Sequence, residues 1–277
     1  MSSVIGLGEV GSAVANEFKK YPPYTVYTIT VGDKRTYGKK TYIKKQKTAE
    51  KYEEKCPSLK NFLKNVKGDV LFIVDGAELA SAASLRILSH IKQCNITILY
   101  VKSETKFLSA EEKMNEATVR GVLQEYARSA VFEKIILVDV PIIANTLSGL
   151  TVKNYHSKIR ESLASTLHMV EVFSRSKPAL GSEKAPHPAA RLVTVGHMDM
   201  KTGKENLFFP LDYPRERCYY YAINEDKLEN DSSLLDKINE QVSAAAHDNM
   251  DVSYGIYSTQ YEKDYVYVVS RSSAIQN

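Results

Sequence analysis

Short apolar segments alternate with helical patterns throughout the first half of the chain. The apolar segments are Ser3–Leu7, Tyr24–Val31, Asp69–Val74, Ile96–Val101 and Lys134–Val138. Alternation of this kind, with strands that are apolar on both faces, is typical of a parallel sheet covered by helices on both sides. We therefore predict an α/β fold with a Rossmann-type parallel sheet. Its ligand crevice should lie at the carboxyl ends of the strands.

The intervening segments carry helical periodicity or turn residues. We predict helices over Val10–Lys20, Ala49–Lys67 with a break near Pro57, Ser81–Gln93 and Ser109–Arg128. In the last of these, Ser109 followed by Glu112 has the spacing of a capping box. Gly32–Thr48 is basic and shows no regular pattern, so we predict an irregular loop there.

The character of the sequence changes after a long helical pattern over Asn154–Arg175. Ser176–Ala190 is rich in proline and predicts a loop. The remainder alternates short strands with one helix and predicts a smaller mixed α+β domain. The expected organisation is a nucleotide-binding-like α/β domain over 1–153, a central helix over 154–176, and a C-terminal mixed α+β domain over 177–277.

Composition excludes several classes of protein. The 277 residues carry 37 Lys+Arg against 33 Asp+Glu, a net charge of +4, which is too balanced to make nucleic-acid or membrane binding the default. No uncharged apolar run approaches the roughly 18–20 residues of a membrane span. The N-terminus lacks a signal-peptide pattern. Cys56, Cys94 and Cys218 are widely separated and have no metal-ligand spacing. These features predict a cytoplasmic protein.

The first turn is a G-x-G-x-x-G motif, Gly6–Gly11, between a predicted strand and a predicted helix. Such glycines let the backbone approach a pyrophosphate, and the helix N-terminus offers free N–H groups to it. A dinucleotide site also needs an acid at the end of the second strand. That strand ends at Gly32 without one, and Asp33 lies beyond it next to Lys34 and Arg35. A strand–helix turn that needs small residues for packing is the alternative.

The loop after the second strand concentrates positive charge and contains Tyr37 and Tyr42. Cations interleaved with aromatic rings suit a phosphate backbone with stacked bases. A solvated loop, or a contact with an acidic face of a neighbouring subunit, are the alternatives. The candidate nucleic-acid contacts are Lys34, Arg35, Lys39, Lys40, Lys44, Lys45 and Lys47.

The order of segments resembles that of the tubulin/FtsZ superfamily along nearly the whole chain. Ile5–Asn16, IGLGEVGSAVAN, is similar to the first glycine loop of FtsZ and its helix, and Lys67–Val74, KGDVLFIV, to the strand before the family's signature loop. Asn154–Phe173 is placed like the central helix. The segments that resemble the C-terminal domain of FtsZ are Tyr219–Ile223, Leu234–Asp248, Asn249–Tyr257 and Asp264–Ser270. The resemblance implies a tubulin/FtsZ-like fold.

The sequence departs from this family at both places that carry its chemistry. The signature loop is a run of glycines and threonines, whereas the matching Asp75–Ser84 keeps one glycine. It puts the carboxylates of Asp75 and Glu78 where phosphate would approach. The acidic catalytic loop is replaced by Ser176–Ala190, whose only acid is Glu183. We therefore expect no GTP hydrolysis and assign no catalytic or metal-binding residue.

We expect no cofactor, and the resemblance leaves open only GTP or GDP. Binding of a nucleotide would depend on Gly6, Gly8, Gly11, Ser81, Glu116, Arg120 and Asp139.

Three functions follow from these observations. The first is a non-catalytic structural or interaction protein that associates with itself or with a larger assembly. Its small size resembles divergent phage- or plasmid-type members, which would place it in the host cytoplasm if it is phage-encoded. The second is an NAD(P)-binding oxidoreductase or sensor that uses Gly6–Gly11. The third is a nucleic-acid-associated accessory protein that uses the Lys34–Lys47 loop.

Overall fold

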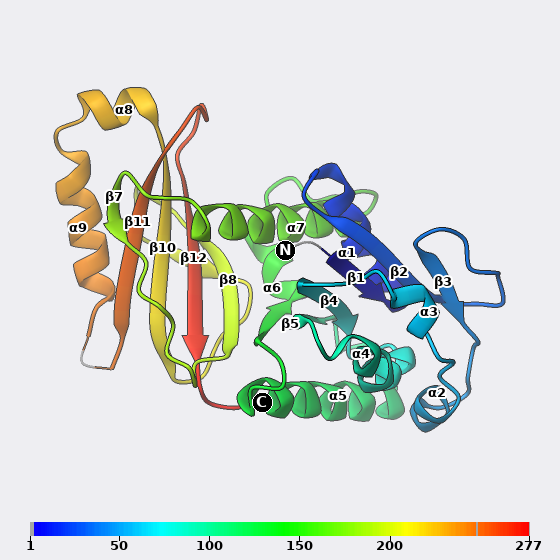
Figure 1. The fold of residues 1–277 in the computed structure, drawn as a ribbon. Coiled ribbons are helices and arrows are strands. Elements are labelled where there is room, and N and C mark those ends of the chain that lie inside the picture. The colour runs from blue at the N-terminus through cyan, green and yellow to red at the C-terminus, as the bar shows by residue number, and fades with distance from the viewer. Residues whose placement is uncertain (1–2, 248, 277) are drawn as a thin grey trace. The chain divides into compact units, whose positions relative to one another are not determined.

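The computed structural model describes residues 3–247 and 249–276. The chain forms two compact units, Met1–Ala164 and Ser165–Asn277. The long helix α7, Tyr155–Ser174, starts in the first unit and ends in the second. The segment predicted as a separate central helix thus contributes residues to both units (Figure 1).

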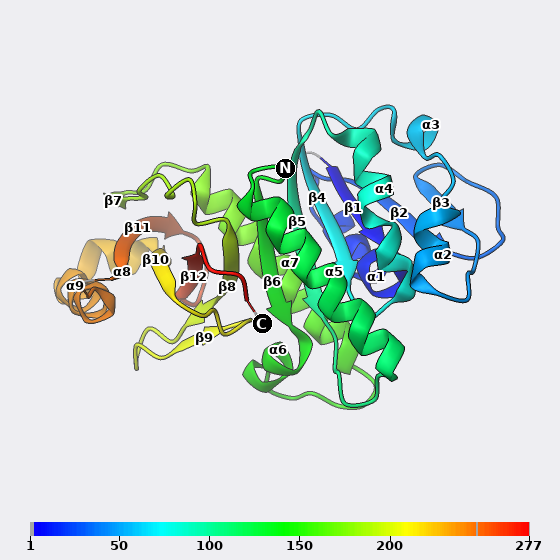
Figure 2. The same ribbon diagram turned by 90° about the horizontal axis from the view of Figure 1, so that it is seen from below.

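The first unit contains a parallel sheet in which the order of strands is β3-β2-β1-β4-β5-β6. Its inner strands are almost entirely buried, as the apolar runs predict. All strands point the same way, so their carboxyl ends share one edge (Figure 2). The strands are β1 Ser3–Leu7, β2 Thr25–Val31, β3 Lys40–Ile43, β4 Asp69–Asp75, β5 Asn95–Lys102 and β6 Lys134–Asp139.

Helices cover both faces of this sheet (Figure 1). Helix α1 packs on β2 and β4, and α5 lies on the opposite face against β5 and β6. The capping box predicted at Ser109 and Glu112 is present at the start of α5. The helical segments are α1 Gly8–Glu17, η1 Phe18–Lys20, α2 Ala49–Glu54, α3 Lys60–Leu63, η2 Leu79–Ala83, α4 Ser84–Leu88, η3 Ser89–Ile91, α5 Ala110–Arg128 and α6 Val140–Thr146.

The second unit contains a mixed sheet in which the order of strands is β8-β12-β10-β11-β7, and β9 pairs with β8. Strands β10 and β11 are parallel and are joined through two helices. The elements are β7 Leu180–Ser182, β8 Leu192–Met198, β9 Glu205–Leu207, β10 Pro214–Asn224, α8 Glu225–Asn230, α9 Leu234–Ala245, β11 Asp251–Thr259 and β12 Tyr265–Ser272. The helix predicted over Leu234–Asp248 ends at Ala245, and Asp248 lies outside the described residues.

Strand β10 buries aromatic side chains on both of its faces. Tyr219 and Tyr221 belong to one cluster with Ile238 of α9. Tyr220 lies on the other face, where its ring stacks with Phe173 at a centroid distance of 6.4 Å. This alternation follows from the two-residue period of a strand, and it places α9 and the end of α7 on opposite faces.

Three predicted segments differ from the structure. The loop predicted over Gly32–Thr48 contains β3, which pairs with β2, and the loop predicted over Ser176–Ala190 contains β7, which pairs with β11. The helix predicted over Ser81–Gln93 is split into 3₁₀ and α segments. Among the described residues, no helix is both long and apolar enough to cross a membrane.

Candidate functional site

The glycine turn at the start of α1 is tightly packed. Gly8 has φ of +80°, a left-handed conformation that favours glycine. A Cβ atom on Gly6 would lie 2.3 Å from the carbonyl oxygen of Gly11, and one on Gly11 would lie 2.5 Å from that of Ile73. Packing of strand, turn and helix therefore requires these glycines, whatever the turn binds.

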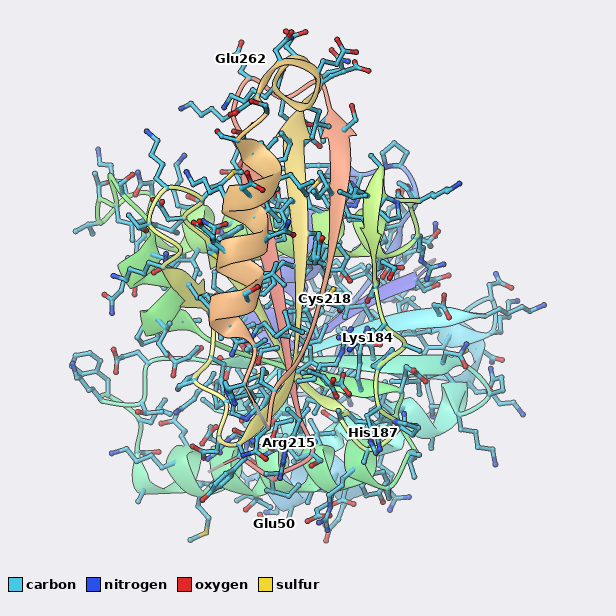
Figure 3. All side chains as sticks on the ribbon, turned by 90° about the vertical axis from the view of Figure 1, so that its left-hand side faces the viewer. Glu50, Lys184, His187, Arg215, Cys218 and Glu262 are labelled. Carbon is cyan, nitrogen blue, oxygen red and sulfur yellow. The ribbon has the colours of Figure 1, made fainter. Side chains whose placement is uncertain are left out.

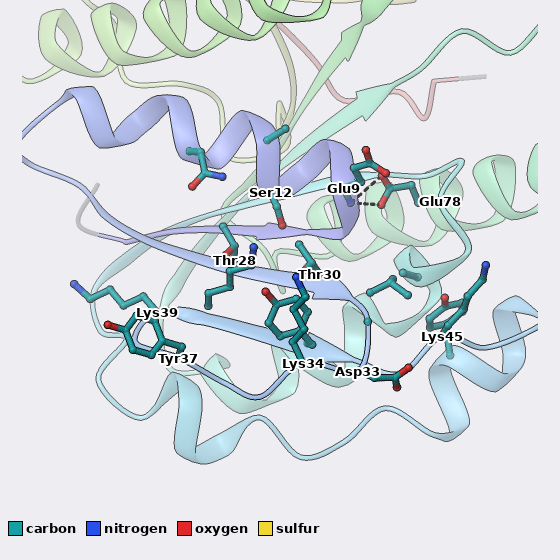
Figure 4. Close-up of a pocket in the computed structure, with 18 of the residues that line it drawn as sticks. Glu9, Ser12, Thr28, Thr30, Asp33, Lys34, Tyr37, Lys39, Lys45 and Glu78 are labelled. Atoms are coloured by element: carbon teal, nitrogen blue, oxygen red, sulfur yellow. Dashed lines mark hydrogen bonds between the residues drawn. The ribbon is translucent and has the colours of Figure 1, made fainter.

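The N-terminus of α1 is bound by a carboxylate of the same chain. Glu78 Oε1 accepts hydrogen bonds from the backbone N–H groups of Glu9, at 3.0 Å, and Val10, at 2.8 Å. Glu78 Oε2 also accepts from Glu9, at 2.9 Å (Figure 4). A Cβ on Gly8 would lie 1.5 Å from this oxygen. The free amides and positive dipole end that bind phosphate in such turns are thus occupied by Glu78.

Burial and a neighbouring negative charge both change the pKa of the Glu78 carboxyl group. Burial raises its pKa to about 7; the hydrogen bond from Val10 opposes this, and the nearby Asp75 carboxylate adds to it. Asp75 ends β4, where its Oδ1 accepts a hydrogen bond from Ala77 N–H at 2.9 Å and its Oδ2 accepts one from the hydroxyl of Ser103. Burial raises the pKa of Asp75 as well. An anion bound at this position would be repelled by both carboxylates.

A buried amide holds the loop that carries Glu78. Asn115 Nδ2 lies 2.7 Å from the carbonyl oxygen of Gly76, 3.2 Å from that of Glu78 and 3.0 Å from Ser81 Oγ. Ser81 in turn donates to the carbonyl of Gly76 at 3.2 Å. Ser81, predicted as a nucleotide contact, is buried beneath the loop and braces it.

Glu116 and Arg120 form a second buried cluster against the same loop. The hydroxyl of Tyr100 donates to Glu116 Oε1 at 2.8 Å, and Arg120 Nε donates to the same oxygen at 2.9 Å. A Cβ on Gly76 would lie 1.8 Å from the Tyr100 oxygen, so glycine lets the loop approach this ring. Burial, followed by the Glu116 charge, raises the pKa of Tyr100. The hydrogen bonds of Glu116 and Arg120 stabilise the loop.

Asp139 ends β6, apart from this cluster in the hydrogen-bond network. It caps α6 by accepting a hydrogen bond from Ile142 N–H at 3.3 Å, and its carboxylate lies 3.6 Å from Lys102 Nζ. Burial raises its pKa, and Ile142 and Lys102 oppose that change. The described part of the chain holds no group of three or more His, Cys, Asp or Glu side chains suited to a metal ion.

The segment Ser176–Ala190, predicted to take the place of an acidic catalytic loop, makes its contacts within the second unit. Its only acid, Glu183, lies 3.6 Å from the guanidinium of Arg271. His187 donates its backbone N–H to Glu216 at 2.6 Å, and Lys184 and His187 lie along one segment in Figure 3. Cys218 is a buried free thiol of β10. These contacts are structural, and none supplies a carboxylate for positioning a water molecule.

A groove of about 1260 Å³ runs beside the glycine turn. Ser12 and Asn16 of α1 form one wall, and Thr28 and Thr30 of β2 form its floor (Figure 4). The segment over residues 33–45, which comprises the β2–β3 loop, strand β3 and the residues after it, contributes charged and aromatic side chains. Those on the groove are Asp33, Lys34, Tyr37, Lys39, Lys40, Tyr42 and Lys45.

The sequence indicated that Glu78 lies near the phosphate position, but it gave no sign that the carboxylate pairs with backbone amides. It did not predict that Asn115 or Tyr100 would belong to the site. Asn115 bonds the loop after β4 and Tyr100 bonds Glu116 of α5, both across long separations in the chain. Only polar residue types inside helix α5 and strand β5 hinted at buried partners, because polar groups in such positions need hydrogen bonds.

Comparison with solved structures identifies the fold. An empty FtsZ dimer from M. jannaschii superimposes with a TM-score of 0.67 at 10% identity, covering 98% of this chain and 87% of that one. A GTPγS-form protofilament of TubZ from Bacillus thuringiensis serovar israelensis gives 0.71 at 13% identity, over 99% and 86%. A GTPγS-bound CetZ protofilament from Haloferax volcanii gives 0.65 at 9%, over 98% and 92%. No family model and no curated protein sequence matches the chain.

The chain therefore has the tubulin/FtsZ fold, as the resemblance implied. Identities this low establish the fold alone, and the activity must be argued from the residues.

Proposed function

We propose that this protein is a non-catalytic structural protein with the tubulin/FtsZ fold that associates with copies of itself without a nucleotide. The observation that carries the proposal is the position of Glu78, whose carboxylate accepts the N–H groups of Glu9 and Val10 at the N-terminus of α1. A nucleotide phosphate would have to displace this carboxylate and lie close to Asp75, which is energetically unfavourable.

Displacement of Glu78 is also opposed by the way its loop is held. Asn115 contacts the loop at Gly76, Glu78 and Ser81. Moving the loop aside would leave buried polar groups without partners, at about 1–3 kcal/mol each. The absence of a free carboxylate in the segment around Glu183 supports a non-catalytic role.

Self-association is supported by the assemblies in which the similar structures were solved. These include TubZ and CetZ protofilaments and two- and four-stranded TubZ filaments. One similar TubZ is described as a plasmid segregation protein, which supports a plasmid- or phage-type protein acting in the cytoplasm. Loss of the phosphate site with retention of the core fits a protein that works through contacts between subunits.

The NAD(P)-binding alternative is weakened by the same carboxylate. A dinucleotide pyrophosphate would use the amides that Glu9 and Val10 donate to Glu78. No observation favours a catalytic role for the residues of this turn.

Sedimentation velocity on nucleotide-free protein tests the proposal. We expect the mean mass to rise with protein concentration and to be unchanged by GTP, GDP and Mg²⁺. Glu78→Gln, which keeps a hydrogen-bond acceptor at α1, should assemble to the same extent. A monomer at every concentration, or assembly only with GTP, would contradict the proposal.

A further inference from the structure

The groove beside α1 is rich in positively charged side chains that form no ion pair within the described part of the chain. The cations of the β2–β3 loop, of β3 and of the residues just after it are all exposed. Across residues 3–247 and 249–276 none of them forms an ion pair, although the chain has 33 acidic residues. A loop that keeps its charges unpaired projects a positive potential that attracts an external anion. The cations are Lys34, Arg35, Lys39, Lys40, Lys44, Lys45 and Lys47.

Aromatic rings lie among these cations. Tyr37 is 88% exposed, an unusual position for a large ring that packs on nothing. Lys40 Nζ lies 5.3 Å from the centroid of Tyr42, and Lys39 Nζ lies 5.9 Å from that of Tyr27. Cation–π contacts hold the ammonium groups near the rings and leave their N–H groups free for an anion. Figure 4 shows Tyr37 and Lys39 together at one end of the groove.

We propose that this groove binds single-stranded nucleic acid. The lysines neutralise the phosphates, and the exposed Tyr37 ring stacks with a base. Glu9 and Glu78 lie beside the glycine turn, away from Tyr37 and Lys39, and Asp33 lies near Lys34 on the groove. These carboxylates repel phosphate, so the phosphates should contact the lysines and avoid the acids. This activity is separate from self-association and does not depend on it.

The residue types favour a nucleic acid over an acidic protein segment. A chain of carboxylates would need the lysines but not an exposed ring, whereas every base has a face that stacks on an aromatic side chain. The groove is concave and is walled by α1 and the β2–β3 loop. Stacking on Tyr37 requires an unpaired base, which a single strand offers and a paired duplex does not.

The salt dependence of binding gives a quantitative test. Lys34, Lys39, Lys40 and Lys45 line the groove. If each neutralises one phosphate, log Kobs should fall against log salt with a slope of about −2.8. Affinity should then fall about 50-fold between about 50 mM and about 200 mM salt.

Fluorescence anisotropy with a labelled oligo(dT) of about 20 nucleotides measures this slope on the full chain. The double variant Lys39→Gln/Lys45→Gln should weaken binding and reduce the slope by about 1.4. The matched control Lys177→Gln/Lys263→Gln removes equal charge from exposed positions of the second unit and should change neither.

Tyr37→Ala should weaken binding about 5- to 150-fold with an unchanged slope, because it removes stacking and no charge. These positions are exposed, so circular dichroism should show folded variants. No binding at 50 mM salt, or equal slopes for the two double variants, would overturn the proposal. Equal affinity for a duplex or for polyglutamate would also overturn it, and the latter would identify an acidic protein partner instead.

Discussion

The Glu78 carboxylate should make the stability of the fold depend on pH. Its pKa is raised from 4.5 to about 7, chiefly by burial. The unfolded chain releases this proton near 4.5, so between pH 4.5 and 7 the folded protein binds more protons than the unfolded one. The contribution of protonated Glu78 to the free energy of unfolding is therefore largest below pH 4.5, and it is lost as the pH rises to 7.

The size of this effect follows from the two pKa values. The gap corresponds to about 3 kcal/mol, which we reduce to about 2 kcal/mol because the side chain is half-buried and solvent screens part of the charge. Glu78→Gln is neutral at every pH and lacks the effect. The free energy of unfolding of Glu78→Gln, minus that of the wild type, should rise by about 2 kcal/mol between pH 4.5 and pH 8.

Urea unfolding followed by circular dichroism at a series of pH values measures this difference. The burial of Asp75 also affects the pH profile, but it is common to both proteins. Glu229→Gln is the matched control, because Glu229 is an exposed carboxylate of the second unit, and its profile should run parallel to that of the wild type. A difference between Glu78→Gln and the wild type that does not change with pH would refute burial of this carboxylate at α1.

Other variants test the packing around the turn. Gly8→Ala should destabilise by about 2–4 kcal/mol, because its Cβ displaces Glu78. Gly38→Ala, also at positive φ but in open space, should cost about 1 kcal/mol in the same urea titration; equal costs would contradict the Glu78 contact. Asn115→Ala should cost about 2–4 kcal/mol through its lost loop contacts, and a change below about 0.5 kcal/mol would exclude that role. Burial lowers the pKa of His197 to about 4. The free energy of unfolding of the wild type should therefore fall by about 2 kcal/mol relative to that of His197→Gln as the pH drops from 6.5 to 4. Parallel pH profiles of the two proteins would refute the burial of this imidazole.

The parallel sheet of the first unit was predictable because each of its inner strands is a compact apolar run. Ser3–Leu7 and Asp69–Asp75 match the predicted strands closely. Strands β3 and β7 were missed. Each is short and pairs on one side only, β3 with β2 and β7 with β11. The local sequences are lysine-rich and proline-flanked, so only the neighbouring strand reveals them.

The segment Ser81–Gln93 illustrates a limit of periodicity. Its apolar residues recur at helical spacing, which predicts one helix, yet the chain forms two 3₁₀ turns on either side of α4. Ser81 and Ser84 donate hydrogen bonds to backbone carbonyls of Gly76 and Ser81. Such bonds compete with the regular helix, and their partners depend on the loop after β4.

At the candidate site, the residue types predicted which chemistry was missing but not the arrangement that replaced it. A carboxylate in place of glycine at position 78 argued against phosphate. Its pairing with the amides of Glu9 and Val10 depends on how β1 and β4 align. The support from Asn115 and Tyr100 requires helix α5 and strand β5 to pack beside the loop. Contacts between distant segments of this kind carry no local sequence signal.

Isothermal titration calorimetry of the purified wild-type protein with GTP, GDP and Mg²⁺ tests most directly whether Glu78 has replaced the phosphate. We expect no binding heat at nucleotide concentrations up to about 1 mM. A dissociation constant of this size corresponds to a binding free energy of about −4 kcal/mol, and we expect binding to be weaker than that. Saturable binding at micromolar affinity would contradict the account, because a phosphate would then reach the amides that Glu78 occupies.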